Sequence, residues 1–102
     1  MSTIKIRAKE SKGLVTVKAL IKHPMETGQR KNKKTGDKIP SHFIQEVVGK
    51  ANNNEVITIY WGPAVSKNPY LTFVYSGDKG DTVQISWLDN QGNTDSNTTE
   101  VK

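Results

Sequence analysis

The chain contains no cysteine, so it can form no disulfide and has neither a thiol nucleophile nor a cysteine-ligated metal centre. It also has no apolar run with the length of a membrane span or a signal peptide, which by itself predicts a soluble, cytoplasmic protein. Hydrophobic residues make up only 33% of the 102 residues. We therefore expect one small core in a single domain over residues 1–102, with part of its apolar burial supplied by a partner.

Acidic residues are scarce in the first half of the chain. Residues 1–50 carry twelve Lys and Arg but four acids, whereas residues 51–102 carry three and six. The densest basic segment runs from Arg30 to Lys38 and is too polar to pack in a core. A positive half of this kind predicts an anionic partner, which can be an acidic protein, a nucleic acid or an anionic small molecule.

Alternation of apolar and polar residues recurs along the chain at the short intervals that are typical of an all-β sandwich or barrel. Turn-forming clusters such as Gly77–Gly80 and Asp89–Gly92 separate the runs. The pattern predicts about seven antiparallel strands, at residues 3–8, 14–22, 39–49, 55–61, 70–76, 81–88 and 94–101. Residues 43–48 are ambiguous, because their apolar spacing fits a helical turn nearly as well as a strand.

The side chains that share a strand face predict the core. We expect the following to point inward: Ile4, Ile6, Val15, Val17, Ala19, Ile21, Val83, Ile85 and Trp87. Most of the other aromatic residues also occupy alternating positions and are expected in the core. The set of aromatic residues from which most are expected in the core comprises, besides Trp87, Tyr60, Trp61, Tyr70, Phe73 and Tyr75.

No catalytic or metal-binding set is apparent. His23 and His42 with Glu26 match no standard ligand spacing, so we expect His23 to pack at a strand end and His42 to be exposed. Ser41 and His42 are adjacent on a predicted strand and point to opposite faces, which disfavours a hydrolytic triad. The sequence therefore predicts a protein that is not an enzyme and binds no cofactor.

Nucleic-acid binding is an alternative that the basic segment raises. Single-strand binding requires aromatic side chains along the charged groove, whereas the aromatics here are separate from the basic segment. A solvated loop is the simpler interpretation. A generic immunoglobulin-like interaction module, or one that binds nucleic acid, remains the rival hypothesis.

Two loops carry unusual residue patterns. Pro24 and Gly28 interrupt the apolar strand that precedes His23, and the loop 61–70 is stiffened by Pro63 and Pro69. The second loop suits either recognition or an ordinary crossover between sheets. The candidate partner-binding residues are His23, Pro24, Met25, Glu26, Thr27, Gly28, Gln29, Arg30, Lys31, Asn68, Pro69 and Tyr70.

Read in order, these motifs resemble the SoxZ family of bacterial thiosulfate oxidation. The resemblance covers nearly the whole chain and rests on the run from His23 to Lys31, followed by Ile39-Pro40, Pro63-Ala64, Asn68-Pro69-Tyr70-Leu71, Ser86-Trp87 and the turn Asp89–Gly92. The chain departs from the family at Gly62, where relatives often have histidine.

The resemblance implies an immunoglobulin-like β-sandwich that pairs with a SoxY-like subunit. That subunit bears the sulfur substrate on a glycine-flanked cysteine in its C-terminal arm, and the pair makes transient contacts with other Sox enzymes. The resemblance further implies a non-catalytic role and a periplasmic location reached by export with the partner, with no nucleic acid or membrane bound. A basic rim of Arg30, Lys31, Lys33 and Lys34 would then attract the arm and its anionic cargo.

Overall fold

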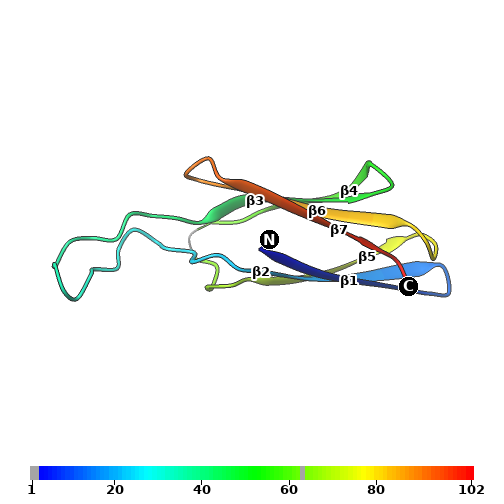
Figure 1. Cartoon of the computed structure of the whole chain (residues 1–102), viewed down its shortest axis with the longest axis horizontal. Helices are drawn as coiled ribbons and strands as arrows, with labels where there is room; N and C mark the ends of the chain where they lie inside the picture. The colour runs from blue at the N-terminus through cyan, green and yellow to red at the C-terminus, as the bar shows by residue number, and fades with distance from the viewer. Residues whose placement is uncertain (1–2, 63) are drawn as a thin grey trace.

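The computed structural model describes residues 3–62 and 64–102, which form seven strands and contain no helix. The strands are β1 (Ile4–Ser11), β2 (Leu14–Ile21), β3 (Ile44–Ala51), β4 (Asn54–Tyr60), β5 (Tyr70–Ser76), β6 (Thr82–Asp89) and β7 (Thr94–Glu100). They build a three-stranded sheet, β1-β2-β5, and a four-stranded sheet, β4-β3-β6-β7. All neighbouring strands are antiparallel, and the two sheets lie one above the other (Figure 1).

The predicted β-sandwich is thus confirmed. Two pairings join strands that are not consecutive, β2 with β5 and β3 with β6, and these are the crossovers that Greek-key sandwiches use. Membrane-crossing helices, judged by length and hydrophobicity, are absent from the part of the chain that the structure describes.

The core lies between the sheets and follows the predicted alternation. Val15, Val17, Ala19 and Ile21 of β2 are fully buried, and they face Val83, Ile85 and Trp87 of β6 across the interior. Ile4 is buried and Ile6 is half-buried, as expected for the inner face of β1. Burial of these side chains contributes most of the free energy that holds the sheets together.

Strand β3 explains why its segment was ambiguous in the sequence. Its register against β6 shifts between Ile44 and Glu46, so Gln45 is an extra residue in the ladder. The bulge lets Ile44 and Val47, three positions apart, both point into the core. A spacing of three mimics one helical turn, although the backbone is extended.

Most of the aromatic residues lie in or against the core, as expected, and two do not. The side chains of Tyr60 and Tyr70 are 77% and 58% exposed, because each lies on the outward face of its strand. Phe73 and Trp87 are buried, and Trp61 and Tyr75 are half-buried against the core.

The segment Glu26–His42 is a long ribbon that projects from one end of the sandwich, and we call it the arm (Figure 1). Its two sides pair at Glu26 with His42 and at Lys31 with Lys38, and a turn at 32–37 forms its tip. The arm accounts for much of the 53 Å length of the molecule. It also corrects the predicted strand 39–49, whose first four residues belong to the arm, because β3 begins only at Ile44.

Candidate functional site

The two motif loops lie side by side at the base of the arm. The Asn68 amide donates to the His23 carbonyl at 2.9 Å, and the Asn68 Oδ1 accepts from the His23 amide at 3.0 Å. Asn68 has a φ of 53°, a left-handed conformation that asparagine tolerates better than most residues. The predicted Pro63 of this loop lies outside the described residues.

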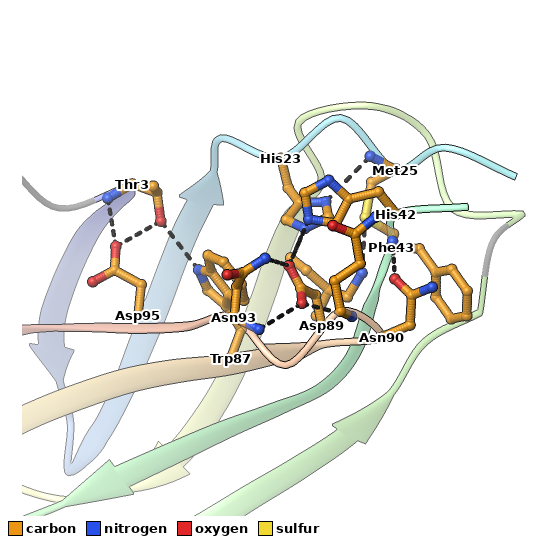
Figure 2. Close-up of polar contacts among 12 residues, drawn as sticks. Thr3, His23, Met25, His42, Phe43, Trp87, Asp89, Asn90, Asn93 and Asp95 are labelled. Carbon is orange, nitrogen blue, oxygen red and sulfur yellow. Dashed lines mark hydrogen bonds and ion pairs between the residues drawn. The ribbon is translucent and has the colours of Figure 1, made fainter. Parts of the chain in front are cut away.

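A buried carboxylate joins the first loop to the end of β6. Asp89 is 1% exposed, and its Oδ2 lies 3.1 Å from His23 Nε2 and 2.7 Å from His42 Nε2 (Figure 2). Its Oδ1 accepts from the backbone amides of Gln91 and Asn93 at 3.0 and 2.8 Å. One side chain therefore connects the start of the arm, the end of the arm and the β6–β7 turn.

These hydrogen bonds determine the ionisation of Asp89. Burial alone would raise its pKa, but the hydrogen bonds from His23, the Asn93 backbone and His42 outweigh burial and lower the pKa to about 2. The carboxylate is therefore charged at neutral pH, and every one of its contacts stabilises that charge.

The histidine tautomer argues against a metal at this cluster. The three potential ligand atoms of His23, His42 and Asp89 lie within 4.8 Å of one another. However, the Met25 amide donates to His23 Nδ1 at 3.2 Å, so the proton of a neutral His23 ring sits on Nε2, where a metal would have to bind. The cluster is a hydrogen-bonded latch, which we call the His-Asp-His latch.

The structure corrects the sequence interpretation of these residues. His42 is only 27% exposed in its side chain rather than fully exposed, and the acid beside the histidines is Asp89 rather than Glu26. Asp89 lies on the same inward face of β6 as Ile85 and Trp87, because side chains of alternate residues in a strand point to the same side. A carboxylate at an inward position was the signal that could have revealed the latch.

Met25 and Gly28 shape the loop at the base of the arm. Met25 is 5% exposed and has a φ of 50°, and its sulfur lies 3.4 Å from the Ile44 amide that donates to it. Gly28 has a φ of 87°, and a Cβ there would lie 3.2 Å from Ser41 Cβ on the opposite side of the arm. Gly28 therefore has a left-handed conformation, which glycine adopts without a steric penalty.

A shallow groove of about 670 Å³ runs between the two loops. It is lined by Pro24, Met25, Glu26, Thr27, Arg30, Ala64, Val65, Ser66 and Lys67. Arg30 is paired with Glu26 through its guanidinium, and this pair lowers the pKa of Glu26 and raises that of Arg30. Lys67 also lies at the groove.

The predicted partner-binding residues fall into three groups by burial. His23, Met25 and Pro69 are buried and act within the chain, where they hold the loops in place. The residues with exposed surface are Pro24, Thr27, Gln29, Arg30, Lys31, Asn68 and Tyr70. Glu26 and Gly28 are half-buried.

Comparison with protein families decides what kind of protein carries this site. The family model described as sulphur oxidation protein SoxZ matches residues 4–100, which include both sheets, both motif loops and the arm. The chain belongs to the SoxZ family. Membership places it in the Sox sulfur-oxidation system. No match was found among the curated proteins.

In this SoxZ-family chain, the buried residues of the site and its exposed residues have different roles. The buried latch fixes the base of the arm, and the exposed groove and arm present polar and basic groups to the solvent. Lys31, Lys33, Lys34 and Lys38 are all exposed on the arm. They surround a single acid, Asp37, at the tip.

Proposed function

We propose that this chain is the non-catalytic subunit of a SoxYZ-type carrier pair in the periplasm. It scaffolds a SoxY-like partner that bears the sulfur substrate on a C-terminal cysteine, and it helps present that cysteine to thiosulfate-oxidising enzymes. It is exported with the partner. The chain has no cysteine, so the covalent chemistry belongs to the partner.

The observation that carries this proposal is the family match over residues 4–100. It spans nearly the whole sandwich, so the sulfur-oxidation assignment applies to the folded unit and not to one motif. The histidine tautomer in the latch supports a scaffolding role, because it leaves the donors of that cluster committed to hydrogen bonds.

The groove and the arm support a role in presentation. Sulfur intermediates on the partner's cysteine are anions on a flexible tether. The groove at the base of the arm is lined by Arg30 and Lys67, and the arm beyond it carries four exposed lysines. Exposed charges of this kind accelerate encounter more than they tighten a finished complex. We expect the arm to guide the loaded tether and the anionic faces of partner enzymes.

Co-expression with the SoxY-like subunit of the same organism tests the central claim. We expect a one-to-one complex by intact-complex mass measurement, and we expect the complex, but not this chain alone, to accept thiosulfate-derived sulfur when supplied with the oxidising enzymes. Recovery of the two chains as separate species would overturn the proposed function, and tight binding of nucleic acid by the purified chain would favour the rival module.

A further inference from the structure

Each sheet of the sandwich has two edge strands, and one of the four differs from the others in charge. The edges are β1 and β5 in one sheet and β4 and β7 in the other. Edge strands commonly carry charges that prevent pairing with other chains. β1 has Lys5, Arg7, Lys9 and Glu10, β4 has Glu55, and β7 has Asp95 and Glu100.

Strand β5 has no such protection. Its sequence, Tyr-Leu-Thr-Phe-Val-Tyr-Ser, contains no charge, no proline and no glycine, and it is rich in residues that favour strands. In the described residues, β2 pairs with one side of β5 and no strand pairs with the other. Its free backbone groups are therefore available to a further strand.

The edges on the opposite side of the sandwich are tied to each other. The Asn97 side-chain amide on β7 donates to the Ile4 carbonyl on β1 at 2.8 Å, and Thr3 donates to Asp95 at 2.7 Å. These contacts occupy the β1 and β7 edges within the chain. On β5, the Tyr75 hydroxyl donates to Asp81 at 3.3 Å, but among the described residues no strand pairs with the outer side of β5.

The outward face beside this edge carries several exposed apolar side chains. Tyr70 and Val74 of β5 are 58% and 55% exposed, and the cross-strand partner of Tyr70 is Leu20 of β2, which is 37% exposed. Leu14 is also exposed on the same face of β2. These side chains form an apolar stripe next to the unpaired backbone, and we call edge and stripe together the β5 surface.

The rest of that face indicates the charge of the partner. Its outward residues on β1 and β2 include Lys5, Arg7, Lys9 and Lys18, and none of the outward residues of β1, β2 and β5 is acidic. Like charges would repel a second copy of this chain, which has a net charge of +5. The face is complementary to an acidic partner.

We infer that the β5 surface is the docking surface of the SoxY-like subunit, which adds an extended strand along β5 and covers the stripe of Tyr70, Val74 and Leu20. This inference rests on the proposed function, because it takes the occupant from the carrier pair. It locates that pairing on the three-stranded sheet, and the arm that presents the cargo projects from the end of the sandwich where β5 begins.

The test compares one substitution on two edge strands, in this chain co-purified with the SoxY-like subunit. Val74→Lys places a charge on β5, and Val56→Lys places the same charge at an exposed valine on β4. We expect Val74→Lys to lower the affinity of the complex at least about tenfold, because the lysine replaces an apolar contact of the stripe and must lose its water of hydration there. We expect Val56→Lys to change the affinity by less than about twofold. Tyr70→Ser should also weaken the complex, without adding charge.

Circular dichroism and thermal unfolding of each free variant separate misfolding from lost docking. Hydrogen exchange provides a second measurement: amides of β5 should gain protection in the wild-type complex, and those of β4 should not. If the wild-type chain forms the complex and neither Val74→Lys nor Tyr70→Ser lowers its affinity, the inference is overturned and the proposed function is left intact. If no complex with the wild-type chain forms, both the proposed function and the SoxY-like subunit as the partner of the β5 surface are overturned. If the chain instead forms a stable homodimer that Val74→Lys disrupts, a second copy of this chain and not an acidic partner occupies the β5 surface.

Discussion

Asp89 shows how one side chain can organise three segments. Its side chain points inward from β6, where an apolar residue would ordinarily pack. The burial of this carboxylate is compensated because five hydrogen-bond donors reach its two oxygens. A buried carboxylate without those donors would be strongly destabilising. The latch therefore makes the position of His23 and His42, and with them the base of the arm, dependent on a single charge.

Asp89→Asn should destabilise the chain by about 2–4 kcal/mol, because the amide replaces one accepting oxygen with a donor that faces histidine N–H groups. Urea unfolding followed by circular dichroism measures the loss. Asp37→Asn at the exposed tip of the arm is the matched control and should change the free energy of unfolding by less than about 0.5 kcal/mol. Equal effects of the two substitutions would contradict the latch.

The latch also predicts a dependence of stability on pH. The folded pKa of Asp89 is lowered to about 2 from an ordinary value of 3.8, so its contribution is complete above about pH 5 and declines as the pH falls toward 2. The difference in unfolding free energy between wild type and Asp89→Asn should therefore shrink over that range. A difference that stays constant from pH 6 to pH 2 would show that the Asp89 charge contributes nothing.

Strand β3 shows how packing between the sheets constrains a strand. Gly49 faces the interior, where a Cβ would lie 2.7 Å from Ile57 of β4 and 3.0 Å from Phe73 of β5. The close approach of these two side chains requires a residue without a side chain at this position. The glycine thus helps both outer strands to close over the core.

Gly49→Ala should destabilise the sandwich by about 1–3 kcal/mol, since Ile57 and Phe73 must move to admit the methyl group. Thermal unfolding of the free chain gives the shift in Tm. Gly62→Ala is the control, because a Cβ at Gly62 meets no atom within 4 Å. If the control loses as much stability as Gly49→Ala, the clash is not the cause.

The arm leads to a kinetic prediction. Arg30 is compensated by Glu26, so the free positive charge resides on Lys31, Lys33, Lys34 and Lys38. Replacing these four lysines with glutamine should slow association of the loaded carrier with its oxidising enzymes and flatten the salt dependence of the rate, with little change in dissociation. Stopped-flow measurements at low and physiological salt test this, with Lys79→Gln in the turn between β5 and β6 as a control outside the arm. An unchanged salt dependence would contradict steering by the arm.

The complete sandwich has one core, in which β2 and β6 supply most of the fully buried side chains. A single domain over residues 1–102 remains a prediction, and it implies cooperative unfolding. The transitions followed by far-ultraviolet circular dichroism and by tryptophan fluorescence should coincide, because Trp87 lies in the core that both sheets share. Separate midpoints would indicate that the sheets, or the arm and the sandwich, unfold independently.

The strands and their buried faces follow from the amino-acid sequence, because alternation with a period of two is a local property that burial on one side selects. The alternation in β2 and β6 predicts the observed core directly. The backbone turns of the motif loops are also indicated by the sequence, because Gly28 and Asn68 occupy left-handed conformations that few other residue types tolerate. The bulge at Gln45 shows the limit, because a register shift depends on the neighbouring strand.

Only the tertiary structure shows what the His23–Lys31 motif is joined to. His23 and Asp89 are 66 residues apart, and His42 reaches the same oxygen from the far side of the arm. No local pattern specifies a contact between residues so distant, because it depends on how two crossovers bring β6 beside the end of β2. The sequence determined a basic, cysteine-free β-sandwich of the SoxZ type, and the packing of its sheets decided that His23 of this motif belongs to a buried latch and that the β5 edge is left open.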